Sequence, residues 1–155
     1  MKTLPRRTFL KGIIATGGAM ALGTTVLPSA VMADWPKLAF EATSVDDAIM
    51  ALFESPDVEE SDKITIDAPE NAENGAIVPV EITANLPKVE SITIISEKNP
   101  TPLIGQFKFA DNAEAWVKTR IKMDKTSEVV AVVKADGKLY VARRKVKVTR
   151  GGCGS

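Results

Sequence analysis

The alternation of apolar and polar residues after Asp57 is the feature that most constrains the fold of this chain. The clearest run is 115–123, where Ala115, Val117, Thr119, Ile121 and Met123 share one face of a strand and Trp116, Lys118, Arg120 and Lys122 share the other. Similar runs predict strands at Lys63–Asp67, Ala76–Ala84, Lys88–Ser96, Ile104–Ala110, Ala115–Met123, Ser127–Ala135 and Lys138–Thr149. About seven short strands separated by turns predict an all-β fold, an antiparallel β-sandwich.

Three places within this pattern carry local information. Pro79 cannot donate a backbone hydrogen bond, so we expect a sheet edge or a bulge there. Asp136-Gly137 is a tight hairpin signal between the last two predicted strands. Asn99-Pro100-Thr101-Pro102 is a stiff connection.

A short helix precedes the strands. Ser44 can cap its first turn, with Asp47 three positions later. Five apolar residues at helical spacing predict one buried face: Val45, Ala48, Ile49, Leu52 and Phe53. We expect this face to pack on the domain core and the helix to end at Ser55-Pro56.

The first 33 residues have the three-part layout of a signal peptide. A basic stretch with Arg6 and Arg7 is followed by an apolar run and by the small-x-small site Val31-Met32-Ala33. The motif Arg6-Arg7-Thr8-Phe9-Leu10-Lys11 resembles a twin-arginine (Tat) signal, which bacteria use to export folded proteins. A membrane anchor is the alternative, but glycines and Pro28 interrupt the apolar run. We predict cleavage after Ala33, a soluble domain at 34–149 and a periplasmic location.

Composition excludes several kinds of site. Residues 1–33 hold four of the 20 basic residues and none of the 20 acidic ones, so the rest of the chain carries about −4, which disfavours nucleic-acid binding. Absence of histidine removes histidine-based catalysis and metal sites. A single cysteine excludes an intramolecular disulfide and a cysteine-clustered metal. We expect no cofactor and no metal.

The single cysteine lies in a glycine-rich tail. Residues 150–155 read Arg150-Gly151-Gly152-Cys153-Gly154-Ser155, and this composition predicts a mobile arm. A thiolate forms persulfides and mixed disulfides readily. No base stands near Cys153 to activate it, which favours a covalent carrier over an enzyme.

Several segments together resemble the SoxY family, the sulfur-carrying subunits of the bacterial Sox thiosulfate-oxidation system. They are the Tat signal, the early helix, Asn74–Val80, Asn99–Pro102, Thr119–Met123 and Gly151–Gly154. The family usually ends in Gly-Gly-Cys-Gly-Gly, whereas this chain has Ser155 in the last position.

The resemblance implies an immunoglobulin-like sandwich and a heterodimer with a separate SoxZ subunit. It also implies that Cys153 is the covalent attachment site and that Gly151, Gly152 and Gly154 give the arm its reach. Thiosulfate would be joined to the thiol by the cytochrome SoxAX, and SoxB would hydrolyse off sulfate. SoxCD would oxidise the remaining sulfur, or that sulfur would be stored. The protein itself would not be an enzyme.

Other functions are compatible with the residues. The chain could be an exported structural or interaction module whose cysteine is incidental, a labelling handle or a dimerising disulfide. A redox or sulfurtransfer enzyme would need a pocket and an activating base. The cargo could also be sulfide, polysulfide or elemental sulfur. The partner surface could include Trp35, Trp116 or the sheet edge near Pro79.

Overall fold

The structure is a computed structural model that describes residues 36–151. All of them belong to the second of two compact units, Trp35–Ser155. The predicted signal peptide, with Arg6 and Arg7, and the tail residues Gly152, Cys153 and Gly154 lie outside the described residues.

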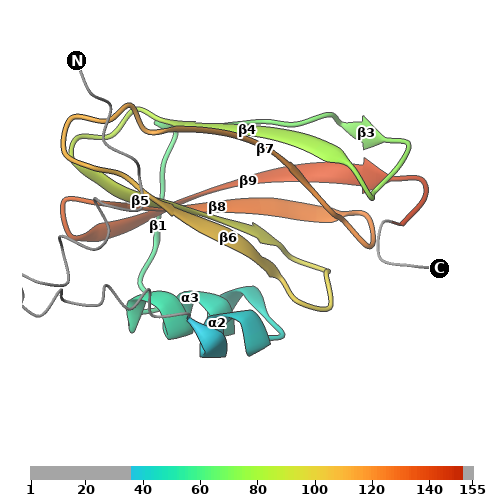
Figure 1. The fold of residues 1–155 in the computed structure, drawn as a ribbon, viewed down its shortest axis with the longest axis horizontal. Helices are drawn as coiled ribbons and strands as arrows, with labels where there is room; N and C mark the ends of the chain where they lie inside the picture. The colour runs from blue at the N-terminus through green and yellow to red at the C-terminus, as the bar shows by residue number, and fades with distance from the viewer. Residues whose placement is uncertain (1–35, 152–155) are drawn as a thin grey trace, which may run out of the picture. The chain divides into compact units, whose positions relative to one another are not determined.

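Two β-sheets and a pair of helices make up the described unit (Figure 1). The helices are α2 Lys37–Glu41 and α3 Val45–Phe53. The strands are β1 Glu59–Glu60, β2 Ile64–Asp67, β3 Asn71–Ala72, β4 Val78–Ala84, β5 Val89–Ser96, β6 Leu103–Lys108, β7 Trp116–Ile121, β8 Ser127–Ala135 and β9 Lys138–Val148. The larger sheet has the order β1-β9-β8-β5-β6, with β3 also pairing with β9, and the smaller has the order β2-β4-β7. The prediction of an all-β sandwich is confirmed.

The larger sheet is covered on both faces. Its inner face packs against the smaller sheet, with Val129, Ala131 and Val133 of β8 in that core. Its outer face packs against α2 and α3 through Val130 and Val132 of the same strand. This double burial explains why β8 reads as a continuous apolar run instead of an alternating one.

Helix α3 begins as predicted, with Ser44 at its N-cap. The Ser44 hydroxyl accepts a hydrogen bond from the Asp47 backbone N–H at 3.1 Å and donates one to the Asp47 carboxylate at 2.6 Å. Ala48 and Ile49 are buried under the larger sheet, so the predicted apolar face packs on the core.

The sequence pattern missed three short elements. Helix α2 is one, and the two-residue strands β1 and β3 are the others. Both strands pair in parallel with β9, so the sandwich is not purely antiparallel. Two residues are too few to show the alternation of a strand. These segments are strands only because they pair with the free edge of β9.

The predictions of a sheet edge or bulge at Pro79 and of a tight hairpin at Asp136-Gly137 are confirmed. At Pro79 only β7 pairs with β4, because β2 covers only Glu81–Ala84, so this position is an edge within an otherwise central strand. Asp136 and Gly137 have φ values of 49° and 76°, the positive values that a two-residue hairpin requires. None of the helices within 36–151 is long and apolar enough to cross a membrane.

Candidate functional site: the base of the arm

The end of β9 carries the chain toward Cys153, so the site begins where that strand leaves the sheet. Loops from three other parts of the chain meet there: 73–77, 97–102 and 122–126. Figure 1 shows the turn between β5 and β6 and the end of β7 at the same end of the sandwich as the C-terminal end of β9. We call Gly75, Asn99, the segment 122–124 and Arg150-Gly151 the arm base.

Backbone and hydroxyl hydrogen bonds fix the last residues of β9. Lys147 N–H donates to Glu70 and Thr149 N–H donates to Ala72, at 2.9 and 3.0 Å. The Thr126 hydroxyl accepts from Val148 N–H at 2.9 Å. The strand is therefore held on both sides up to the residue before Arg150.

Gly75 joins the end of the chain to the segment after β7. Its N–H donates to the Arg150 carbonyl and its carbonyl accepts from Met123 N–H, both at 2.7 Å. A side chain at this position would collide with the Met123 carbonyl oxygen and lie 2.8 Å from a Val148 methyl group. Glycine is required here because of space and not because of backbone conformation, since only Gly137 has positive φ among the described glycines.

Asn99 holds the same segment from the opposite side. Its amide nitrogen donates to the Lys122 carbonyl at 2.7 Å, and its amide oxygen accepts from Asp124 N–H at 2.8 Å. Gly151 packs next to this turn, where a β-carbon would lie 2.5 Å from the Asp124 carbonyl oxygen. Asn99 and Gly75 thus fix the segment on which Gly151 rests.

These contacts bring together segments that the sequence analysis treated separately. Only the family resemblance linked Asn74–Val80, Asn99–Pro102 and Thr119–Met123 to one another, and the structure places part of each at the arm base. Sequence reasoning missed Asn99 and Gly75 as functional candidates. One signal in the sequence could have pointed to them: a glycine and an asparagine lie in predicted loops, and in a sandwich these loops can meet at one end.

Arg150 and Gly151 are the only predicted arm residues that the structure describes, and both contact the domain. Free reach can therefore start only after Gly151. Cys153 follows two positions later in the sequence. The roles of Cys153, Gly152 and Gly154 stay predictions, as do those of Arg6 and Arg7.

Trp116 and Pro79, two of the predicted partner-surface residues, lie on the smaller sheet. The Trp116 indole donates to the Glu81 carboxylate at 2.7 Å, and Lys118 contacts its other oxygen at 2.8 Å. The Lys118 ammonium, and next the indole, hold the pKa of Glu81 below 4.5, and Glu81 raises the pKa of Lys118 above 10.5. Trp116 is thus engaged within its own sheet, although it is 44% exposed. Trp35 lies outside the described residues.

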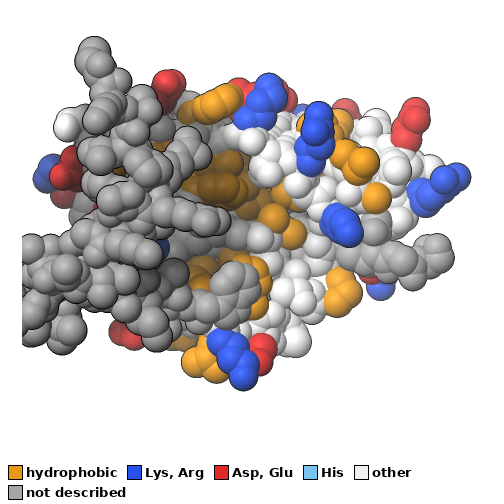
Figure 2. Space-filling model, viewed as in Figure 1, with side chains coloured by type: hydrophobic (Ala, Val, Ile, Leu, Met, Phe, Trp, Pro, Cys, Tyr) orange, Lys and Arg blue, Asp and Glu red, His pale blue; other side chains and the backbone are white. Residues whose placement is uncertain are grey.

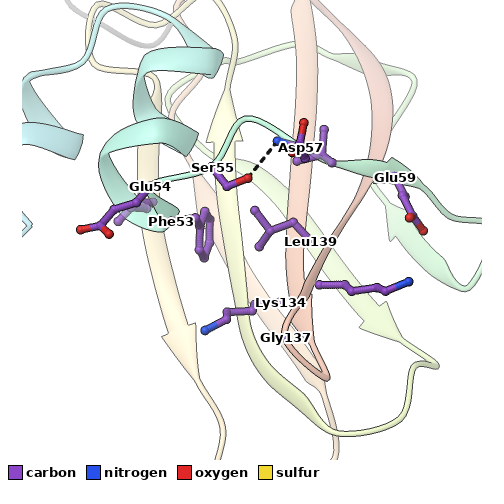
Figure 3. A pocket seen from close by; sticks show the side chains of 11 residues that line it. Phe53, Glu54, Ser55, Asp57, Glu59, Lys134, Gly137 and Leu139 are labelled. Atoms are coloured by element: carbon purple, nitrogen blue, oxygen red, sulfur yellow. Dashed lines mark hydrogen bonds between the residues drawn. The ribbon is translucent and has the colours of Figure 1, made fainter.

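A hollow of about 590 Å³ lies between the end of α3 and the β8–β9 hairpin. Figure 3 shows Phe53 and Leu139 facing each other across it, with Ser55 accepting a hydrogen bond from Asp57 N–H at 3.2 Å. Its lining mixes acids with Lys134 and Lys138 and contains no thiol. It lies at the start of β9, and the 11 residues of that strand separate it from the arm base by about 35 Å.

Neither this hollow nor the arm base contains a metal-binding group. Among residues 36–151, no cluster of three or more Cys, Asp or Glu side chains is arranged to hold a metal ion. The arm base offers backbone groups, the Asn99 amide, the charged side chains of Lys122 and Arg150 and the Asp124 carboxylate. These groups can position a segment, and none of them is an activated nucleophile.

Comparisons with known proteins found a matching family and similar solved structures. The model of the family described as "Sulfur oxidation protein SoxY" matches residues 49–153, a range that ends at Cys153. The solved structure of the sulfur carrier protein SoxY from Chlorobium limicola f thiosulfatophilum is 44% identical. That match covers 73% of this chain and 97% of the other, with a TM-score of 0.64.

A superoxide reductase (neelaredoxin) from Ignicoccus hospitalis is also similar in structure, with 19% identity and a TM-score of 0.52. The match covers 59% of this chain and 94% of that one, and it shows the sandwich fold alone. The search of curated proteins gave no match. Because the family match spans most of the chain and reaches the cysteine of the tail, this protein belongs to the SoxY family of sulfur oxidation proteins.

Proposed function

We propose that this protein is a sulfur carrier in which Cys153 holds sulfur intermediates covalently and presents them to separate enzymes. The observation that carries the proposal is the family match, which extends through Cys153. The similar structure from Chlorobium limicola f thiosulfatophilum is that of a sulfur carrier protein, and it is matched over nearly its whole length.

Loading of the thiol is an oxidation. A thiol and thiosulfate combine to give the thiosulfonate Cys–S–S–SO₃⁻, one proton and two electrons, so an electron acceptor is required. A c-type cytochrome of the SoxAX kind would accept the two electrons. The S–S bond forms between the cysteine sulfur and the outer, sulfane sulfur of thiosulfate.

Unloading begins with hydrolysis. Water attacks the sulfonate sulfur of Cys–S–S–SO₃⁻, and the S–S bond to that sulfur breaks, leaving a cysteine persulfide and hydrogen sulfate. A SoxB-type hydrolase would catalyse this step, and a SoxCD-type enzyme would oxidise the persulfide. The carrier contributes no acid or base of its own, which is consistent with an arm base built mostly from backbone contacts.

The held arm base supports a carrier in a second way. Gly75 and Asn99 fix the segment next to Gly151, so Cys153 starts from a defined point on the domain. The residues on both sides of the cysteine are glycines, which have no side chain. The segment that carries the thiol is therefore thin enough to enter a narrow active site. A SoxZ-type subunit would bind the sandwich, and the Tat-like segment would export the complex to the periplasm.

The test is the intact mass of the mature protein purified without reductant from cells grown on thiosulfate. We expect an adduct on Cys153 that reductant removes, with the mass of a thiosulfonate or of added sulfur atoms. Cys153→Ser should abolish the adduct and leave strand content and thermal stability unchanged, because strands and helices within residues 36–151 build both cores.

Two results would contradict the proposal. One is a bare thiol, or only a disulfide-linked dimer, in the wild type. The other is normal loading in the Cys153→Ser variant. Either would favour a structural module whose cysteine is incidental.

A further inference from the structure

The short distance between the arm base and the thiol limits how an enzyme can reach Cys153. Cys153 stands two positions after Gly151, which packs against Asp124. Two extended residues span at most about 7 Å. An enzyme that acts on the thiol must therefore bring the entrance of its active site up to the arm base and contact the residues around it.

Four exposed cations surround that point: Lys98, Lys122, Lys125 and Arg150. We call them the cation collar. Their backbones are part of the arm base or adjoin it, since Lys122 and Arg150 accept hydrogen bonds there, Lys98 precedes Asn99 and Lys125 follows Asp124. Figure 2 shows Lys and Arg side chains toward the end of the molecule at which β3 and the end of β9 lie.

The collar is weakly neutralised. Within residues 36–151 only Lys125 has an ion pair, with Asp124 at 3.8 Å, and Lys98, Lys122 and Arg150 have none. Of the acids in the same loops, Glu97 and Asp124 are half-buried and only Glu73 is exposed. Glu97 also accepts a hydrogen bond from Glu128 N–H at 3.4 Å. The four cations against these three acids give a net charge of about +1 around the arm, and most of the exposed charge there is positive.

The rest of the domain has the opposite charge. Residues 36–62, which form the helices and the segment after them, contain eight acidic residues and one basic residue. Over residues 36–151 there are 16 basic and 19 acidic residues. The domain is thus negative overall and positive where the arm leaves it.

From this placement we propose that the cation collar is the docking surface for enzymes that receive the arm, and that it fits an acidic rim around their active-site entrance. A charged partner of that kind is attracted to the arm end and repelled by the helix layer, so it meets the thiol in the correct orientation. The proposal rests on the proposed function, because it needs an enzyme that acts on Cys153.

The experiment measures the rate of thiosulfonate formation on Cys153 by the SoxAX-type cytochrome, with carrier below saturation, between about 0.02 and about 0.5 M salt. The purified protein is used with any subunit that copurifies. The test variant is the double charge reversal Lys122→Glu/Lys125→Glu. We expect it to lower the rate at low salt by about tenfold or more, and to approach the wild-type rate at high salt.

The matched control is Lys63→Glu/Lys138→Glu, which changes the net charge equally. Both lysines are exposed, lie at the end of the sandwich away from the arm and make no ion pair among the described residues. We expect the loading rate of this variant to stay within about twofold of the wild-type rate, because charges that lie more than a Debye length from the docked enzyme are screened.

Loading of Cys153 by tetrathionate is a second measurement, and it separates docking of the enzyme from attraction of the thiosulfate anion. Tetrathionate loads a thiolate without an enzyme, forming Cys–S–S–SO₃⁻ and releasing thiosulfate. We expect all variants to react with tetrathionate at similar rates. An equal fall with tetrathionate and with the cytochrome would overturn the docking proposal, since the collar would then act on the anion.

The direction in which salt changes the wild-type loading rate is an independent test of the docking surface. If net charge governed the encounter with an acidic partner, this negative domain would load faster as salt rises. The collar predicts that wild-type loading slows as salt rises. A wild-type rate that rises, or equal rates in both double variants, would overturn the docking surface alone. A wild-type chain that the cytochrome never loads would overturn the proposed function as well.

Discussion

The two ends of the sandwich are built differently. At the arm base, Gly75 has no space for a side chain, and the Asn99 amide makes two hydrogen bonds to backbone atoms, of 2.7 and 2.8 Å. At the other end, the β8–β9 hairpin borders a hollow of about 590 Å³, and Gly137 has nothing within 4 Å of where a β-carbon would lie. The tightly packed end is the one from which the chain continues to Cys153.

This contrast indicates what a carrier must keep rigid. A thiol on a short segment can be presented reproducibly only if the segment starts from a fixed point. The hairpin end has no such task, and an open, polar turn there is sufficient to reverse the chain. We expect substitutions that disturb the packing or the hydrogen bonds of the arm base to alter loading and stability together, and the matched substitutions elsewhere to alter neither.

Gly75→Ala should cause the largest loss of stability among these variants. The added methyl group would collide with the Met123 carbonyl oxygen, so the loop 73–77 or the segment after β7 must move. Overpacking a closely packed site costs about 1–3 kcal/mol and occasionally more, and a collision with a backbone atom places this variant at the upper end. We expect a clearly lower Tm in thermal unfolding and slower loading of Cys153.

Gly105→Ala is the matched control for Gly75→Ala. A β-carbon at Gly105 would meet only the Phe107 ring, at 4.0 Å, so we expect a change of Tm near zero. Equal losses in the two variants would mean that the arm base is no more tightly packed than an exposed edge strand.

Asn99→Ala should give the next largest effect. It removes both hydrogen bonds to the 122–124 segment, each worth about 0.5–1.5 kcal/mol, so we expect a loss of about 1–3 kcal/mol. The local effect should be clearer: amide hydrogen exchange at Asp124 should accelerate, because its N–H loses the acceptor. Asn99→Asp keeps that acceptor but not the donor to Lys122, so it should retain part of the protection.

The control for Asn99 is Asn85→Ala. The Asn85 side chain is exposed and makes no hydrogen bond within residues 36–151, although its backbone N–H donates to Lys63 at 2.9 Å. We expect no change in exchange at Asp124. If Asn99→Ala also leaves that exchange unchanged, Asn99 does not hold the arm base.

The strands could be predicted from sequence because each contains its own pattern. In 115–123 the period of two assigns every side chain to a face, and the structure buries Val117, Ile121 and Met123 as that pattern requires. The Ser44 cap and the Asp136-Gly137 hairpin are equally local, since the residues that make them are neighbours.

The arm base could not be predicted because none of it is local. The Asn99 side chain contacts residues 23 and 25 positions away, and Gly75 contacts a residue at the far end of the domain. No period or motif encodes such contacts. They follow only from the order in which β4, β5, β7 and β9 are placed in the two sheets. The two parallel strands β1 and β3 were missed for the same reason, because each depends on the edge of β9.

Glu81→Gln should give the smallest effect, and it calibrates how much an exposed charge contributes to this domain. Glu81 lies on the outer face of the smaller sheet, where Lys118 and then Trp116 hold its pKa below 4.5. A carboxyl whose pKa is lower in the folded state stabilises that state above its unfolded pKa, and this contribution is lost as the pH falls through the folded pKa.

Chemical denaturation of wild type and Glu81→Gln between about pH 7 and about pH 2.5 measures this contribution. We expect a small advantage for the wild type near pH 7, within the range usual for surface ion pairs, and a convergence of the two curves as the pH falls through the lowered pKa of Glu81. Lys122→Glu/Lys125→Glu should show a smaller pH-dependent difference, because Lys122 has no ion pair within the described residues and Lys125 pairs only with Asp124 at 3.8 Å. If that variant instead loses more stability than Glu81→Gln, the collar stabilises the arm base itself, and its effect on loading could no longer be assigned to docking alone.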